Sequence, residues 1–359
     1  MNVMGQAPTA PERAIRFTGT WREYLPIAAS NVLLIIVTLG IYRFWAAARQ
    51  RRYLWSRTEV IGDRLEWSGT GKEMFIGFLV VMVVLLPFFL MFQFLLPALA
   101  ARGKLGAAGA ATIIFYVVIL YLTGVAGFRA LRYRLSRTWW RGIRGGSDEP
   151  GWRYGGQYLG RTLIAFFTMF IAWPWMATAL FRSRWNEMSF GSLKFQSYLR
   201  AEGLGRRWAA IYLIPVALAI VGGVATASIG LGGGGGGRAS LSVVVLGLFL
   251  AVYLAIPLLT LHWYAKFYRK AAESLSLGDL EFGFDATTWD WLKLFLGNIA
   301  LAVVTLGLGL AYWGYRNWAF MVRHVHLYGE INVSELGQST TRAPTEAEGF
   351  ADAFDMGAI

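Results

Sequence analysis

Hydrophobic residues along this chain are concentrated in long runs. A helix of about 18 to 20 apolar residues spans the roughly 30 Å hydrocarbon core of a bilayer. Four runs are long enough: Met74–Leu99, Leu105–Phe128, Trp208–Ile229 and Leu241–His262. We therefore predict four transmembrane helices at these positions.

Three further apolar segments are of similar length but are interrupted by polar or helix-breaking residues. They are Tyr24–Ala47, Tyr158–Leu180 and Trp291–Tyr315. The first and third share seven identities at one constant offset, in which Asn31, Val37, Thr38, Leu39, Gly40, Arg49 and Gly62 correspond to Asn298, Val304, Thr305, Leu306, Gly307, Arg316 and Gly329. The middle segment is a degenerate copy that has Thr168-Met169-Phe170 in place of Thr-Leu-Gly.

Self-similarity at a fixed offset is the signature of internal repeats. We predict a polar lead over residues 1–15, a first repeat over 16–151, a second over 152–279 and a truncated third over 280–336. Residues 337–359 are small, polar and acidic, which is typical of a disordered tail.

The placement of positive charge bears on how the repeat segments meet the membrane. Residues 45–72, 128–157 and 181–207 contain six, seven and six Lys or Arg, whereas 100–106 and 230–240 contain two and one. Loops rich in Lys and Arg stay in the cytoplasm. If the three repeat helices bend back or re-enter, every strongly basic segment lies on that one side. Their length still allows the alternative, seven plain spans.

Composition supports a membrane class. Of 359 residues, 56% are hydrophobic and only 15% are charged, against about a quarter charged in soluble domains. Sixteen Trp, many near the ends of apolar runs, are typical of interface anchors. There is no Cys, which excludes disulfides and thiolate metal sites. Residues 1–17 contain no continuous apolar run, so we expect no cleaved signal peptide.

The basic connectors contain alternating apolar and polar residues around a glycine, which predicts short β-hairpins. The candidates are Thr58–Trp67, Met188–Phe195 and His326–Val333, with further strands at Arg16–Trp21, Arg153–Tyr158 and Leu280–Phe284. The expected fold is therefore a mainly α-helical polytopic membrane protein with short β-hairpins on its cytoplasmic face. Residues 231–237 form a glycine-rich loop on the other face.

The segment from Asn31 to Trp55, NVLLIIVTLGIYRFWAAARQRRYLW, followed by Leu65–Phe78, resembles the YjgN-like family of bacterial inner-membrane proteins, which has no assigned function. The phrase Arg137-Thr-Trp-Trp-Arg-Gly-Ile143 is also similar to a phrase of that family. The resemblance extends from Phe17 to about Leu336. It implies the bacterial cytoplasmic membrane, and it supplies no substrate, cofactor or catalytic residue.

The sequence contains few residue patterns that are typical of catalytic, metal-binding or phosphate-binding sites. His324 and His326 form the one close His pair, with Glu330 as the nearest acid, and we interpret them as structural. Gly232–Gly237 and Gly69–Lys72 lack the Gly-Lys-Ser/Thr ending of a phosphate-binding loop. We therefore expect no enzyme activity, no cofactor and no metal site.

Two groups of residues remain as candidate sites. The first is a set of basic clusters next to the membrane, which attract anionic lipid headgroups: Arg49, Arg51, Arg52, Arg141, Arg144, Arg182, Arg184 and Arg206. The second is a set of polar or hinge positions in the repeat helices, which pack against other helices or line a polar path: Asn31, Thr38, Gly40, Asn298, Thr305 and Gly307.

These candidates support two hypotheses of function. The first is a non-enzymatic inner-membrane protein that binds anionic phospholipid or organises a membrane protein partner. The alternative is a channel or carrier for a small or lipidic solute, with a path near the Asn and Thr-Leu-Gly positions. Nucleic acid is not an expected partner.

Overall fold

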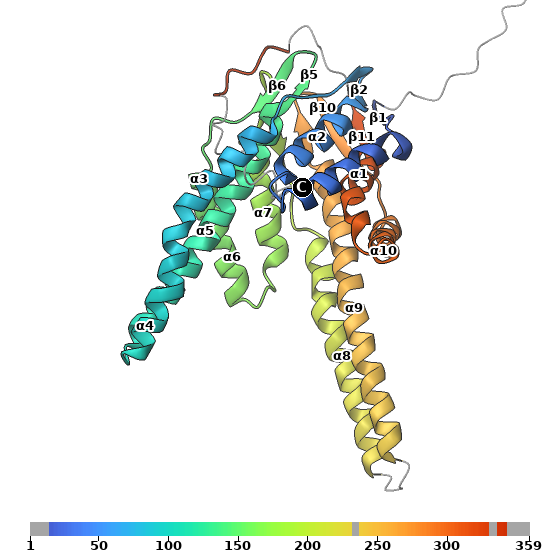
Figure 1. Ribbon diagram of the computed structural model, residues 1–359. Helices are drawn as coiled ribbons and strands as arrows, with labels where there is room; N and C mark the ends of the chain where they lie inside the picture. The colour runs from blue at the N-terminus through green and yellow to red at the C-terminus, as the bar shows by residue number, and fades with distance from the viewer. Residues whose placement is uncertain (1–13, 232–236, 330–335, 343–359) are drawn as a thin grey trace, which may run out of the picture.

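The protein is described here by a computed structural model that covers residues 14–231, 237–329 and 336–342. Helices predominate, and short strands gather at one end of the longest helices (Figure 1). The predicted lead, most of the glycine-rich loop, the second half of the His326–Val333 hairpin and residues 343–359 lie outside the described residues.

Four helical segments are long and apolar enough to cross a membrane, at the four predicted positions. The first contains α3 (Gly71–Leu90), a π-helical turn (Met91–Leu95) and α4 (Leu96–Ala101). The others are α5 (Leu105–Arg137), α8 (Leu204–Leu231) and α9 (Gly237–Glu273). Their most apolar windows are at most 6% buried within the protein, as expected for helices whose side chains face lipid.

The three repeat segments each consist of two shorter helices joined by a turn. The pairs are α1 (Trp21–Val37) with α2 (Arg43–Ser56), α6 (Trp152–Phe167) with α7 (Trp173–Trp185), and α10 (Thr288–Val304) with α11 (Trp313–His324). A 3₁₀ turn, Leu308–Tyr312, precedes α11. None of the three segments is one continuous helix. The division of the chain into three repeats stays a prediction.

A threonine ends the first helix of each pair. The Thr38 hydroxyl donates to the Leu34 carbonyl (2.7 Å) and accepts from the Tyr42 amide (2.9 Å), which closes the turn. Leu39 and Gly40 follow with φ of 51° and 91°, and Leu306 and Gly307 have the same pair of values. Glycine adopts this left-handed conformation without a Cβ penalty.

The strands form two antiparallel sheets, of order β1-β2-β3 and β11-β10-β9-β8-β7-β6-β5-β4. Their bounds are Ile15–Phe17, Thr58–Val60, Asp63–Arg64, Glu66–Trp67, Thr138–Trp140, Ile143–Gly146, Ser189–Phe190, Leu193–Ser197, Leu275–Leu277, Leu280–Phe284 and Val325–Tyr328, from β1 to β11. The strand predicted at Arg153–Tyr158 is wrong. This segment is the start of α6, where Gly155 packs so closely on Tyr121 and Val125 of α5 that a Cβ would lie 2.5 Å from Val125.

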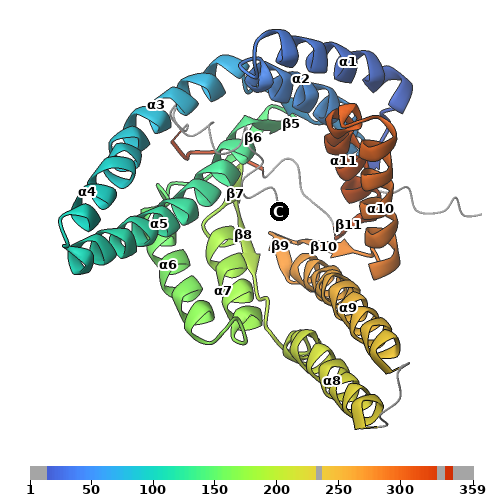
Figure 2. The same cartoon turned by 60° about the horizontal axis from the view of Figure 1, so that its bottom comes forward.

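The helix pairs surround a common centre, which Figure 2 shows from a second direction. The first and last pairs meet and close this arrangement. The rings of Tyr24 on α1 and Tyr315 on α11 stack at 5.1 Å, and the Tyr315 hydroxyl donates to the Gly19 carbonyl (3.1 Å). Both residues belong to a buried cluster that also contains Trp55 and Tyr133. This contact positions α2 and α11 side by side above the long helices.

Two helix pairs, α3 with α5 and α1 with α2, are also connected at the sheet end by polar contacts. The Thr70 side chain caps α3, and the Glu73 carboxylate accepts from the Tyr133 hydroxyl (2.9 Å) and pairs with Arg137 (3.2 Å) at the end of α5. The first pair repeats this arrangement with Glu23, Tyr53 and Arg57. An acid in the first turn of a helix also complements its macrodipole.

Candidate functional site

A cavity of about 720 Å³ lies between α2, the end of α5, and helices α9, α10 and α11. We call it the central cavity. Small-molecule sites typically occupy roughly 300–1,000 Å³, so its volume suits a ligand. The residues that line it are Gln50, Arg51, Leu54, Trp55, Arg134, Leu261, Tyr264, Tyr268, Trp291, Leu294, Phe295, Asn298, Trp313, Gly314, Asn317, Trp318, Phe320 and Met321.

Two guanidinium groups give the central cavity its charge. Arg51 lies in the last half of α2, is only 6% exposed, and stacks over the Trp67 ring at 5.2 Å. Arg134 lies one turn before β5, where its carbonyl accepts from the Thr138 hydroxyl (2.8 Å). The described lining residues include no carboxylate. Two guanidinium groups therefore lie on the side of the cavity nearest the sheet.

Aromatic rings form most of the remaining wall. Trp55 of α2 and Trp318 of α11 stack with ring centroids 4.1 Å apart. Trp291 of α10 stacks on Tyr268 of α9 at 5.4 Å and meets Phe320 edge-on at 4.9 Å. These contacts connect four helices into one apolar surface, which offers an acyl chain or a ring a large contact area.

Two buried polar atoms of the cavity lining have no hydrogen-bond partner among the described residues. Asn298 is 7% exposed; its amide nitrogen donates to Asn317 (3.0 Å), but its Oδ1 has no donor. The indole Nε1 of Trp291 is likewise without an acceptor. Leaving such an atom unpaired costs about 1–3 kcal/mol. Pairing them requires a hydrogen-bond donor for Asn298 Oδ1 and an acceptor for Trp291 Nε1.

Two of the predicted site residues, Arg51 and Asn298, line the same cavity. Asn31 does not: its amide nitrogen donates to the Ala46 carbonyl (3.4 Å) within its own helix pair. Arg49 is also bound there, because it donates to the Ser30 hydroxyl (2.8 Å). Thr38, Gly40, Thr305 and Gly307 form the two turns described above.

The remaining predicted arginines are dispersed. Arg52 is exposed on α2, and Arg184 of α7 has a buried Nε without a partner. Arg182 lines a separate polar pocket of about 390 Å³. Arg141, in the β5–β6 turn, pairs with Asp63 and covers the Trp140 ring. None of these four residues is among those that line the central cavity with Arg51.

Arg144 contacts Gln338 and Thr341, near the last residues that the structure describes. Its backbone amide donates to Gln338 Oε1 (3.3 Å) and its guanidinium donates to the Thr341 carbonyl. Burial, together with the charge of Arg137, lowers the pKa of Arg144. Residues 336–342 thus lie against β6 and the β5–β6 turn.

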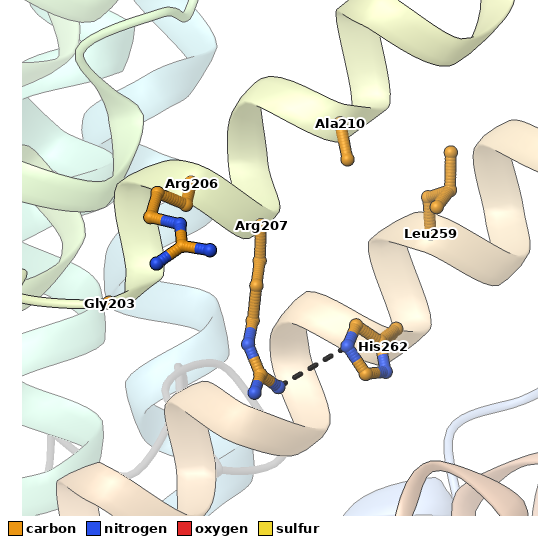
Figure 3. A pocket seen from close by; sticks show the side chains of 6 residues that line it. All are labelled: Gly203, Arg206, Arg207, Ala210, Leu259 and His262. Carbon is orange, nitrogen blue, oxygen red and sulfur yellow. Dashed lines mark hydrogen bonds between the residues drawn. The ribbon is translucent and has the colours of Figure 1, made fainter.

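Arg206 lies at the start of α8 beside a pocket of about 500 Å³ (Figure 3). The neighbouring Arg207 reaches across to His262 of α9, with 3.2 Å between Nη1 and Nε2, while Arg206 points away from that contact. His262 Nδ1 lies 3.0 Å from the Thr288 hydroxyl at the start of α10. The pair therefore connects α8, α9 and α10.

Sequence analysis did not identify Asp285, the acid that pairs with His324 and His326. The Asp285 carboxylate lies 2.6 Å from His324 Nδ1 and 2.9 Å from His326 Nε2, whereas Glu330 lies outside the described residues. Partial burial acts to raise the pKa of Asp285, but the hydrogen bonds from His326 and His324 outweigh it and hold the pKa below its ordinary value. Within the described part of the chain, no group of three His, Cys, Asp or Glu is arranged to hold a metal ion.

Comparison with known proteins identifies a family whose function is unknown. Residues 12–353 match a protein family described as "Bacterial protein of unknown function (DUF898)". Inner membrane protein YjgN of Escherichia coli K12 is 31% identical over 134 residues, which is 37% of this chain and 31% of that protein. YjgN of Salmonella typhimurium LT2 is 35% identical over 68 residues, 19% of this chain and 17% of that protein. The matched stretches thus span a third or less of these relatives, and no solved structure matches.

Proposed function

The chain belongs to this YjgN-like family of bacterial inner-membrane proteins of unknown function, and on that premise we propose that it binds an anionic membrane lipid in the central cavity without chemically transforming it. Four apolar helices and the names of the relatives support a location in the inner membrane. Within that location, a ligand with a charged head and an apolar body is the class that the cavity fits.

One observation carries this proposal: charge and apolar surface are segregated within one cavity. Arg51 and Arg134 lie next to the sheet, where a phosphate headgroup would receive charge-assisted hydrogen bonds. The stacked rings of Trp55, Trp318 and Trp291 provide the surface for the acyl region. The same segregation exists in a phospholipid at the membrane boundary.

The orientation that we propose follows the charge pattern. With the basic turns and strands in the cytoplasm, α3–α5 and α8–α9 cross the membrane and return. Helix α1 runs across the direction of α8 and α9 in Figure 1, so the first pair lies along the boundary instead of crossing it. The exposed tips of the short pairs, Leu39 (93%) and Leu306 (94%), then enter the cytoplasmic leaflet.

The test is lipid retention by the detergent-purified chain, measured by native mass spectrometry with dioleoyl phosphatidylglycerol or phosphatidylcholine. Arg134→Gln removes one guanidinium, and Leu261→Trp fills the cavity without changing charge. We expect Arg134→Gln to lower retention of phosphatidylglycerol about tenfold, because hydrogen bonds to charged groups contribute roughly 1.5–3 kcal/mol. Leu261→Trp should also lower it, because the larger side chain occupies space that the lipid needs. Lys194→Gln, at an exposed position on β8, is the charge-matched control.

Equal retention of the two lipids by the unaltered protein would refute the proposal. So would an equal loss in the control, since that would indicate non-specific attraction. Thermal unfolding of each variant shows whether it is folded, and Arg51→Gln is used only as a third variant because Arg51 is buried against Trp67.

A second candidate function is transfer of the bound lipid between leaflets. It is favoured by Asn298, whose unpaired Oδ1 lies in the cavity at a position where the sequence predicted a polar path. Proteoliposomes containing fluorescent lipid would show accelerated exchange between leaflets that Asn298→Leu reduces. Binding with no acceleration would exclude transfer and leave the binding proposal intact.

A further inference from the structure

A second pocket, of about 320 Å³, lies between α10 and α11 and adjoins the central cavity through Leu294 and Phe320. Its lining contains three cations, Lys293, Arg316 and Arg323, with His324 beside them. We call it the basic pocket. Lys293 and Arg316 come from facing helices of one pair, so their charges converge on the same space.

Asp290 is the one acid among the described residues that line the basic pocket, and the fold already uses it. Asp290 accepts from the Thr287 amide (3.0 Å) and hydroxyl (2.6 Å) in the capping box of α10. These hydrogen bonds lower the pKa of Asp290, so it is ionised at neutral pH. Its charge, 3.8 Å from Lys293, offsets one of the two positive charges of Lys293 and Arg316. One positive charge of this pair remains.

Arg316 has no partner that explains its position. Its Nε is buried without a hydrogen-bond acceptor among the described residues. Arg49, the matching residue of the first helix pair, donates to the Ser30 hydroxyl at 2.8 Å. The position that matches Ser30 is Gly297, and a Cβ built there would lie 2.4 Å from Arg316 Nη2. The serine that holds Arg49 is absent, and the guanidinium of Arg316 occupies that space.

We propose that the basic pocket is a binding site for a phosphate group, with Arg316 and Lys293 as its principal ligands. A phosphate monoester carries close to two negative charges at neutral pH and three acceptor oxygens, which matches the surplus of charge and the unused Nε donor of Arg316. The planar guanidinium also suits the spacing of phosphate oxygens. Arg316 and Lys293 do not line the central cavity, so this proposal can be tested separately from lipid binding by Arg51 and Arg134.

A phosphate group could arrive on a soluble molecule or as the headgroup of a membrane lipid, so the experiment uses two probes. The first is inorganic phosphate, titrated against the detergent-purified full chain at constant ionic strength with thermal unfolding as readout. A ligand that binds only the folded state raises the unfolding temperature with concentration. The second is dioleoyl phosphatidic acid, whose retention is compared with that of phosphatidylcholine by native mass spectrometry.

Three variants separate the pocket from general electrostatics. Arg316→Gln should weaken binding of the effective probe about tenfold or more, because it removes the charge and the fork of donors. Gly297→Ser keeps every charge but places a hydroxyl at the position that matches Ser30. This hydroxyl should bind Arg316 as Ser30 binds Arg49, so phosphate binding should weaken several-fold. Lys194→Gln removes one positive charge, as Arg316→Gln does, but at an exposed strand position, and it should leave binding within twofold.

Binding of both probes with this variant pattern supports a site open to soluble phosphates. Binding of phosphatidic acid alone supports a membrane lipid as the source. The proposal is overturned if neither probe binds, if folded Arg316→Gln binds as the unaltered protein does, or if Lys194→Gln loses as much affinity as Arg316→Gln. Arg134→Gln, measured alongside, reports on the central cavity only.

Discussion

The contact between α8 and α9 gives the sharpest test of the packing. Gly222 of α8 is buried against Leu248 of α9, and a Cβ at this glycine would lie 1.9 Å from Leu248 Cδ1 and 2.8 Å from its Cγ. Carbon atoms in contact are normally about 3.5–4.0 Å apart. Because the Cγ is also too close, rotation of the Leu248 terminus alone does not relieve the clash. Small residues allow this close approach of membrane helices.

Gly222→Ala should therefore destabilise the helix pair by about 1–3 kcal/mol, the usual cost of overpacking. The next residue offers a matched control, since a Cβ at Gly223 meets nothing within 4 Å. Gly223→Ala should leave stability unchanged or raise it, because alanine favours a helix over glycine by roughly 0.5–1 kcal/mol. Adding Leu248→Ala to Gly222→Ala should recover most of the loss.

The assay is reversible unfolding of the purified chain in mixed micelles with increasing SDS, followed by helical circular dichroism. The double-mutant cycle between positions 222 and 248 then gives their coupling energy. If Gly222→Ala is as stable as the unaltered protein, or if Gly223→Ala is destabilised as much, the packing of α8 on α9 described above is wrong.

Of three further predictions, two concern the sheet end of the molecule and one concerns its orientation in the membrane. Tyr133→Phe removes the hydroxyl bound to Glu73 and should lower stability in the same unfolding assay by about 1 kcal/mol; no change would mean that Arg137 alone holds the acid. The folded-state pKa of Asp285 is lowered, so ionised Asp285 stabilises the folded protein. This stabilisation is fully present above the unfolded-state pKa, near 3.8, and is lost as the pH falls through the folded-state pKa. Thermal stability of the unaltered protein should thus drop more steeply below about pH 4 than that of Asp285→Asn, and parallel curves would contradict the Asp285–His contacts. The chain has no Cys, so Lys104→Cys in the α4–α5 turn should react with an impermeant maleimide from outside the cell and Lys194→Cys should not; the reverse pattern would invert the proposed orientation.

Local hydrophobicity was enough to predict the four long helices. The expected run Met74–Leu99 differs by a few residues from the observed span Gly71–Ala101. The run predicted to end at His262 instead continues to Glu273, because Lys266 and Arg269 end the apolar pattern without ending the helix. The breaks at Thr38 and Thr305 were predictable because Thr-Leu-Gly combines a hydroxyl with a residue suited to positive φ.

The site depended on contacts between distant parts of the chain. Asn298 was identifiable from the sequence as a polar group in an apolar helix. Trp291 lies seven residues earlier and therefore on the same helical face, and this spacing could have identified it as a second lining residue. Arg51 and Arg134 gave no sign in the sequence that they would share a cavity, since they meet only when α2 packs against the end of α5. Asp285 pairs with His324 through the register of β10 and β11, where Phe284 lies opposite Val325.

The unequal lengths of the helix pairs have a mechanical consequence. Placed as proposed, α3–α5 and α8–α9 displace lipid from both leaflets, whereas the three short pairs displace it from the cytoplasmic leaflet only. The molecule then has a wedge-shaped cross-section within the bilayer. Insertion of such a wedge expands one leaflet relative to the other, so the protein should accumulate where the membrane bulges toward the cytoplasm and should resist being drawn into regions bent the opposite way.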